Sequence, residues 1–148
     1  MGDGGPRIQT KRVTRILVAD GDRAFALFGR YVLRQVGCDV DMAESPDDAL
    51  ELIRDRSRHY SAVVVDPAFL DAEGDSICRQ LFATRPEAAY VLVSESAAVG
   101  SEPHDGRLRK PYQPAALVQA VTAAIEARAI RRRREADLAS APAIAPAS

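Results

Sequence analysis

The chain has 148 residues, 20 of them basic and 21 acidic, with two cysteines and no tryptophan, and its formal net charge is −1. This length suits one compact domain with terminal segments, and 47% hydrophobic against 28% charged residues exclude a wholly disordered or collagen-like chain. The sequence has no apolar run of the roughly 18 residues that span a membrane, no apolar stretch typical of a secretion signal, and too few cysteines for a disulfide framework or a zinc site, so we expect a cytoplasmic protein.

Short aliphatic runs alternate with amphipathic stretches from residue 15 to residue 130. Runs rich in β-branched residues predict strands, and apolar residues at helical spacing predict helices. Asp22 and Ser45 are suitable N-caps for the first two helices. In chain order we expect a strand at 15–20, a helix at 23–36, a strand at 39–43, a helix from Pro46, a strand at 61–66, a helix at 75–83, a strand at 89–93, a weak strand at 107–109 and a helix from Pro114.

Both ends of the chain differ in composition from this central part. Residues 1–14 are glycine-rich and then basic, which predicts a flexible arm, whereas 15–130 form the expected domain. Residues 131–148 begin with the run Arg131–Arg134 and become rich in alanine and proline, which predicts a basic and then disordered tail. We interpret the four arginines as a solvated helix end, with contact to nucleic acid phosphates or an acidic partner as the alternative.

The alternation of strands and helices predicts an α/β fold with a parallel sheet covered by helices on both faces. Functional sites of such sheets lie at the carboxyl ends of the strands. Polar side chains stand at four of these ends: Asp20, followed by Asp22, after the first strand, Asp66 after the third, Ser94 after the fourth and Lys110 after the fifth. We therefore expect these residues to meet at one rim of the sheet.

The chemistry of these side chains suits phosphoryl transfer. Clustered carboxylates form an oxygen-rich site for a hard cation such as Mg²⁺, and a carboxylate beside that cation can attack a phosphoryl group as a nucleophile. The transfer also needs positive charge and hydrogen-bond donors around the phosphoryl oxygens, which Lys110 and Ser94 can supply.

This constellation resembles the receiver domain of two-component response regulators, over about residues 15–130. In that family an acidic pair follows strand 1, a phosphoacceptor aspartate ends strand 3, a threonine or serine ends strand 4 and Lys-Pro follows strand 5. A glycine also stands eight residues after the phosphoacceptor. The matching residues here are Asp20 with Asp22 nearby, Asp66, Ser94, Lys110-Pro111 and Gly74.

The resemblance implies a flavodoxin-like, doubly wound sheet of five parallel strands in the order 2-1-3-4-5. It implies that Asp66 accepts a phosphoryl group and that Ser94 and Lys110 contact the phosphoryl oxygens. Asp20 and Asp66, with Asp22 as a further candidate, are the implied Mg²⁺ ligands. The implied partners are a histidine kinase or phosphotransfer protein and a downstream protein.

Four features depart from the family's pattern. The second acid of the pair is replaced by Gly21, which removes a carboxylate and weakens the expected Mg²⁺ site. Pro67 restrains Asp66 to extended backbone and takes a donor from the loop. Glu95 stands where the family prefers a small residue. Its side chain either repels an incoming phosphoryl donor or points to solvent, and the sequence leaves both alternatives open. The interval 95–109 is too short for a full helix with its connections, so we expect the fourth helix to be shortened or missing.

Our leading hypothesis is a stand-alone receiver domain that acts in phosphorelay signal transduction through protein–protein contact and is not an enzyme in the ordinary sense. The closest alternative is a pseudo-receiver that docks without phosphorylation. A third hypothesis is a haloacid-dehalogenase-like phosphatase, because ILVADGD resembles its first motif with Asp20 as nucleophile and Asp22 as acid–base. A nucleotide-binding module is disfavoured since no glycine-rich loop follows the first strand, and no nucleic-acid partner is expected without a reading module.

Overall fold

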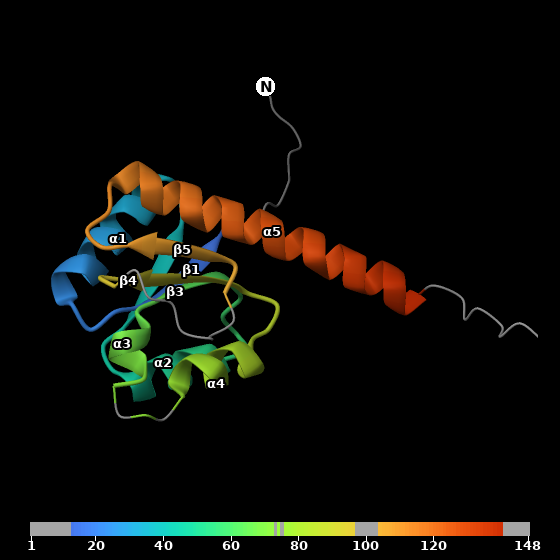
Figure 1. Cartoon of the computed structure of the whole chain (residues 1–148), viewed down its shortest axis with the longest axis horizontal. Helices are drawn as coiled ribbons and strands as arrows, with labels where there is room; N and C mark the ends of the chain where they lie inside the picture. Colours follow the sequence, from blue (N-terminus) through green and yellow to red (C-terminus); the bar gives the residue numbers. More distant parts are fainter. Residues whose placement is uncertain (1–12, 73, 75, 97–103, 141–148) are drawn as a thin grey trace, which may run out of the picture.

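The computed structural model describes residues 13–72, 74, 76–96 and 104–140. Within these ranges strands and helices alternate as predicted (Figure 1). The elements are β1 (Arg15–Ala19), α1 (Arg23–Gln35), β2 (Asp39–Ala43), α2 (Pro46–Arg54), β3 (Tyr60–Val65), α3 (Pro67–Leu70), α4 (Ile77–Thr84), β4 (Ala89–Ser94), β5 (Gly106–Arg109) and α5 (Pro114–Ser140).

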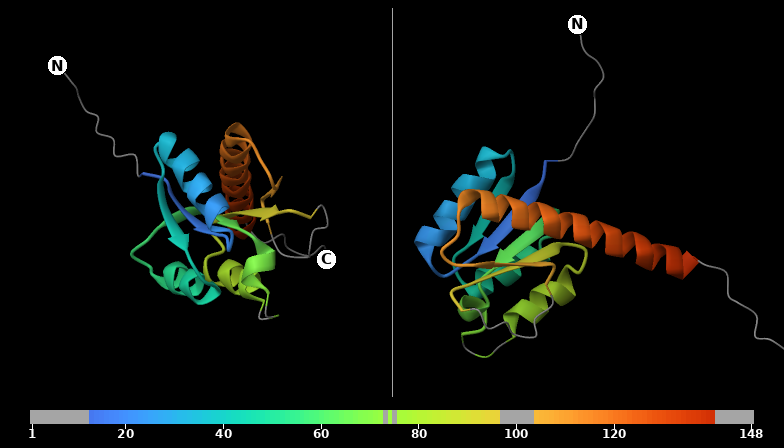
Figure 2. Two further views of the ribbon diagram at one scale, coloured as in Figure 1. Left: turned by 90° about the vertical axis from the view of Figure 1, so that its left-hand side faces the viewer. Right: turned by 45° about the horizontal axis from the view of Figure 1, so that its top comes forward.

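The five strands form one parallel sheet in the order β2-β1-β3-β4-β5, which confirms the predicted topology. Helices α1 and α5 cover one face of the sheet, and α2 and α4 cover the other (Figures 1 and 2). The described residues between β4 and β5, namely 95–96 and 104–105, form no helix. Residues 97–103, on which most of the prediction of a shortened or missing helix falls, lie outside the described residues.

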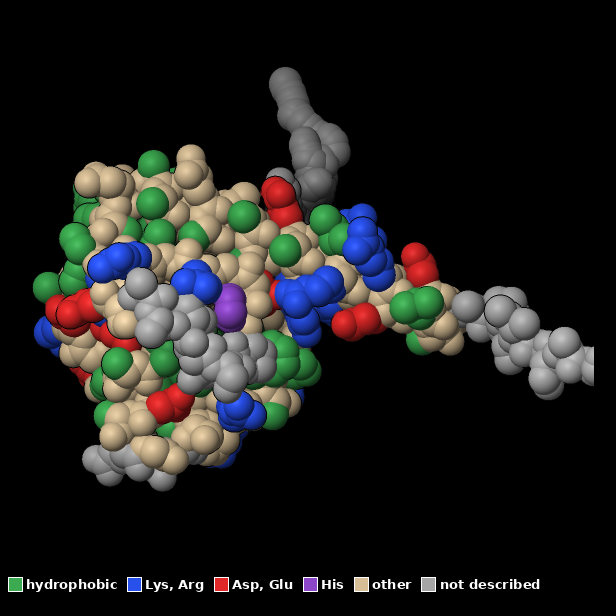
Figure 3. Space-filling view, viewed as in Figure 1, with side chains coloured by type: hydrophobic (Ala, Val, Ile, Leu, Met, Phe, Trp, Pro, Cys, Tyr) green, Lys and Arg blue, Asp and Glu red, His purple; other side chains and the backbone are tan. Residues whose placement is uncertain are grey.

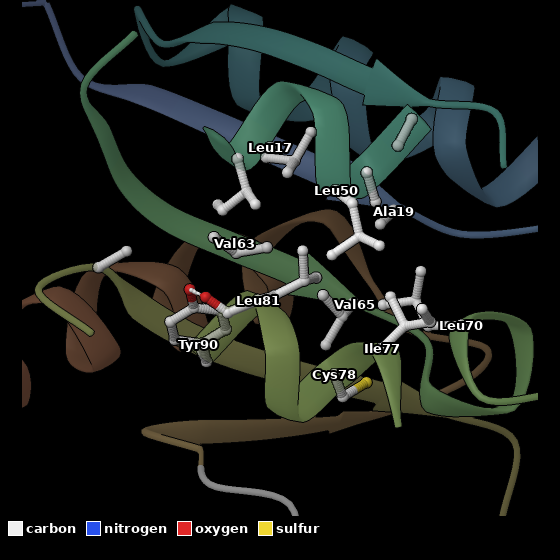
Figure 4. Packing of buried hydrophobic residues seen from close by; sticks show 14 of the residues in the cluster. Leu17, Ala19, Leu50, Val63, Val65, Leu70, Ile77, Cys78, Leu81 and Tyr90 are labelled. Atoms are coloured by element: carbon white, nitrogen blue, oxygen red, sulfur yellow. Dashed lines mark hydrogen bonds between the residues drawn. The ribbon is translucent and has the colours of Figure 1, made fainter. Parts of the chain in front are cut away.

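Side chains that alternate along the strands build a core on each face of the sheet. Leu17 and Val63 point toward α2 and α4, where they pack in one cluster with Leu81 (Figure 4). Val18 points to the opposite face and packs in a second cluster with Leu117 of α5. Because the central strands are apolar on both faces, the sheet is buried, and it holds the carboxyl ends of β1, β3, β4 and β5 at one rim.

Helix α5 is longer than the sequence predicted, since residues 131–140 continue it where we expected a tail. This stretch contains only residues that helices accept, and the first proline after Pro114 is Pro142. The ion pair of Arg131 with Asp105, which precedes β5, also ties the extension to the domain. Residues 1–12 and 141–148 of the predicted arm and tail lie outside the described residues. No described helix combines the length and the apolar character needed to cross a membrane.

The edge strand β2 is held to its neighbours through Asp41. Its carboxylate accepts hydrogen bonds from Arg15 at 3.2 Å, from Arg58 at 3.0 Å and from the Tyr60 hydroxyl at 2.6 Å. Burial by itself would raise the pKa of Asp41, but the Tyr60 hydrogen bond and the charges of Arg15 and Arg58 outweigh it, and the pKa lies below its usual 3.8. The ionised carboxylate is therefore the form that the fold favours.

We expect Asp41→Asn to flatten the acid dependence of stability. A carboxyl group whose pKa is lowered by folding stabilises the protein above its unfolded-state pKa of about 4, and this contribution disappears as the pH falls through the folded-state value. Urea unfolding of the wild type should therefore weaken more steeply than that of the variant as the pH falls below about 5, and at about pH 7 the variant should be less stable by about 1–2 kcal/mol. Asp47→Asn, at an exposed position of α2, is the matched control; parallel profiles for Asp41→Asn and wild type would contradict the assignment.

Candidate functional site

Two of the predicted carboxylates meet the predicted ammonium group at the carboxyl rim of the sheet. Lys110 follows β5, and its Nζ lies 2.7 Å from Asp20 Oδ2, after β1, and 2.8 Å from Asp66 Oδ2, after β3. The side chains of Lys110, Asp20 and Asp66 are 2%, 6% and 14% exposed. Three residues that are far apart in the sequence thus form one nearly buried cluster with a formal charge of about −1, as two carboxylates and one ammonium require.

Lys110 is held in place from several sides. Its backbone N–H donates to the Ser94 carbonyl at 2.8 Å, and its Nζ lies 4.7 Å from the centre of the Phe25 ring. Burial by itself would lower the pKa of Lys110, but the hydrogen bonds to Asp20 and Asp66 and their negative charges raise it above the usual 10.5. The charged ammonium is therefore the stable form, and it neutralises much of the repulsion between the carboxylates.

Asp66 has a second role as the N-cap of the short helix α3. Its Oδ1 accepts a hydrogen bond from the Ala68 N–H at 2.9 Å, and Pro67 occupies the first helical position. The predicted extended backbone of Asp66 is present, but a loop was expected where α3 begins. Asp66-Pro67 is the same pattern as Ser45-Pro46, which correctly predicted the start of α2. The carboxylate is thus fixed on both oxygens while remaining partly open to solvent.

The other two predicted site residues use their side chains locally. Asp22 Oδ1 caps α1, accepting from the N–H groups of Ala24 at 3.0 Å and Phe25 at 3.3 Å. The Ser94 hydroxyl accepts from the Ser96 N–H at 3.0 Å, although Ser94 lies beside Lys110 through its carbonyl. The structure therefore brings Asp20, Asp66 and Lys110 into direct contact, and links Ser94 to them through the backbone alone.

Phe69 is a site residue that sequence reasoning missed. A Cβ atom placed on Gly21 would lie 2.4 Å from Phe69 Cδ1, well inside any permitted contact, so the ring covers the glycine. Gly21 occupies the position where the resembled family has its second acid. The one sequence signal for this arrangement is Asp66-Pro67, which marks the start of the short helix whose third residue is Phe69.

The described residues do not fit a metal site built from three protein carboxylates. No group of three or more histidine, cysteine, aspartate or glutamate side chains in the described part of the chain is placed to hold a metal ion. Asp22 caps α1, the Gly21 position lies under Phe69, and the Lys110 ammonium stands between the two remaining carboxylates. The three predicted Mg²⁺ ligands, Asp20, Asp66 and Asp22, therefore do not form one group in the structure, because the Asp22 carboxylate caps α1.

Two further predicted positions are placed by the structure. Gly74 has a φ of +78°, a left-handed conformation that glycine adopts at low cost, which explains a glycine there. Glu95 is exposed, in accord with the alternative that it points to solvent.

No protein-family model and no curated protein matches the chain. Solved structures match most of its length. A CheY-like response regulator receiver domain protein from Methanospirillum hungatei JF-1 has a TM-score of 0.72 at 20% identity, with 81% of this chain and 99% of that chain covered. A response regulator receiver protein from Sinorhizobium medicae WSM419 has a TM-score of 0.66 at 25% identity, with 78% of this chain and 97% of that chain covered.

A third similar structure is a response regulator protein from Burkholderia pseudomallei, with a phosphorylated aspartic acid, a calcium ion and citrate. Its TM-score is 0.66 at 20% identity, with 88% of this chain and 77% of that chain covered. The structural neighbours are thus response regulator receiver domains, and the fold predicted from the strand-end residues is confirmed.

Proposed function

We propose that the chain is a receiver module that accepts a phosphoryl group on Asp66 in phosphorelay signal transduction. The observation that carries the proposal is the contact of Asp66 with Lys110 at 2.8 Å, on a rim where Asp20 supplies a second carboxylate. A carboxylate that is oriented on both oxygens and partly exposed is a competent nucleophile. An adjacent ammonium supplies positive charge where phosphoryl transfer develops negative charge.

The proposed transfer takes place at this rim. An oxygen of Asp66 attacks the phosphorus of a phosphohistidine, a P–O bond forms as the P–N bond breaks, and the departing imidazole takes a proton from water. Lys110 shifts its ammonium from the Asp66 carboxylate to the oxygens of the acyl phosphate, while Asp20 keeps Lys110 in place. Ser94 would contact the phosphoryl oxygens after giving up its bond to Ser96.

The donor in this proposal is a histidine kinase or a phosphotransfer protein in the cytoplasm, and the output is contact with a downstream protein. The phosphorylated aspartic acid of the Burkholderia pseudomallei neighbour supports this chemistry for the fold. The module turns over no substrate of its own, so we do not class it as an enzyme. No nucleic-acid partner is part of the proposal.

A second candidate function is docking without phosphorylation, as in a pseudo-receiver. It is favoured by the Phe69 ring over Gly21, which fills the place of an acid that the family uses for Mg²⁺. A haloacid-dehalogenase-like phosphatase is disfavoured, because Asp22 would have to act as acid–base but is bound to the first N–H groups of α1.

The two candidates are separated by incubation with acetyl phosphate, in MgCl₂ and in EDTA, followed by intact mass measurement. We expect wild type to gain the mass of one phosphoryl group in MgCl₂ and Asp66→Asn to gain none. Asp47→Asn, which removes an exposed carboxylate of α2, should behave as wild type. No gain in folded wild-type protein under either condition would contradict phosphorylation and favour the docking module.

A further inference from the structure

A pocket lies at the edge of the sheet opposite to the Asp66 cluster. Tyr60 and Ser61, which begin β3, line it together with Glu87, which precedes β4, and with residues of α5. Because Asp66 follows the last residue of β3, the strand separates the two sites by roughly 20 Å. The pocket is therefore independent of the rim that carries the proposed phosphorylation.

The pocket is strongly basic. Three arginines line it, Arg85, Arg128 and Arg132, against the single carboxylate of Glu87. Figure 3 shows basic side chains gathered where α5 leaves the domain. Guanidinium groups remain charged at all physiological pH values and bind phosphate oxygens through paired hydrogen bonds. An excess of positive charge in a recess favours an anionic occupant.

Arg85 is built into the floor of this pocket. Its side chain is 2% exposed, and its terminal nitrogens donate to the carbonyls of Ile53 at 2.7 Å, Asp55 at 3.1 Å and Arg58. Its Nε makes no hydrogen bond to any described residue and lies 3.5 Å from Glu87. The Arg85 guanidinium is thus held by three carbonyls and the Glu87 carboxylate, and it contributes a fixed positive charge to the floor of the pocket.

Arg128 brings a second guanidinium to the pocket from α5. One terminal nitrogen donates to the Pro86 carbonyl, and the guanidinium lies 5.6 Å from the centre of the Phe82 ring. Its Nε is also buried and has no hydrogen-bond partner among the described residues. Arg132 is exposed one turn further along the helix and can close over a ligand from the solvent side.

We propose that this pocket binds a small phosphorylated molecule, whose phosphate group lies among Arg85, Arg128 and Arg132. The side chains of Ile125 and Ala129 form an apolar wall that can cover the rest of the ligand. Two guanidinium groups held in place by backbone carbonyls, with a buried Arg128 Nε–H that has no hydrogen-bond partner among the described residues, distinguish this recess from the solvated arginines further along α5. The proposal does not depend on phosphorylation of Asp66.

The test is an NMR titration of the full chain with inorganic phosphate and with pyrophosphate at constant ionic strength. We expect saturable shifts of the amides of Tyr60, Ser61 and Ala129. Arg132→Gln removes one guanidinium from the pocket without touching the core, and it should weaken pyrophosphate binding about tenfold. Arg134→Gln removes an exposed charge from the same helix outside the pocket, and it should leave affinity unchanged.

Two results would overturn the proposal. Absence of saturable shifts of the Tyr60, Ser61 and Ala129 amides with either anion would show that the recess takes no phosphate. Equal weakening by Arg132→Gln and Arg134→Gln would show a general attraction to the basic helix instead of a site.

Discussion

Combining Gly21→Asp with Phe69→Ala is expected to strengthen divalent-cation binding at the carboxyl rim of the sheet. The double substitution adds a third carboxylate next to Asp20 and removes the ring that now covers this position. Three carboxylates outweigh the single Lys110 ammonium and provide the oxygen ligands that Mg²⁺ prefers. We expect Mn²⁺ binding, followed by electron paramagnetic resonance, to tighten at least about tenfold over wild type.

The two single substitutions separate the effect of the added carboxylate from the effect of the removed ring. Gly21→Asp alone forces a side chain against Phe69, so it should lower stability by about 2 kcal/mol and bind little metal. Phe69→Ala alone opens space without adding a metal ligand, so the Mn²⁺ affinity of this variant should stay near that of wild type. An affinity of the double variant no better than that of Phe69→Ala would show that the ring does not block the site.

Lys110→Met should destabilise the folded chain by about 3 kcal/mol at about pH 7, because it leaves two nearly buried carboxylates without their shared cation. Among the described residues, the backbone N–H groups of Asp22 and Ala68 then remain as hydrogen-bond donors to Asp20 and Asp66.

Chemical unfolding of the variant and of wild type at about pH 7 measures this loss of stability. Arg109→Met, at the exposed neighbouring position, is the control; equal losses for both variants would contradict a special role of Lys110.

The strand-end residues could be predicted because a parallel sheet imposes their meeting place. Once β1, β3 and β5 are recognised as strands of one parallel sheet, their carboxyl ends share one rim, whatever the loops do. Asp20, Asp66 and Lys110 therefore came together as expected. The aliphatic runs that predict these strands are also the residues that form the two cores.

The local use of each polar side chain could not be predicted from strand position. Asp22 was both a candidate metal ligand and a candidate N-cap. In the structure its carboxylate accepts hydrogen bonds from backbone N–H groups of α1, so it serves as the N-cap. The ring of Phe69 reaches Gly21 because α3 turns the chain back directly after Asp66, and so short a helix has no periodicity to detect. The length of α5 was underestimated for a different reason: a basic, alanine-rich stretch suits a helix and a solvated tail equally.

The proposed phosphorylation of Asp66 is tested most directly by locating the phosphoryl group along the chain. Borohydride reduces an aspartyl phosphate to homoserine, and trypsin then releases residues 59–79, which contain Asp66, Asp71 and Asp75. After treatment with acetyl phosphate, fragmentation of this peptide should place homoserine at position 66 alone. Homoserine at position 71 or 75, or in any other peptide, would contradict the assignment of Asp66 as the acceptor.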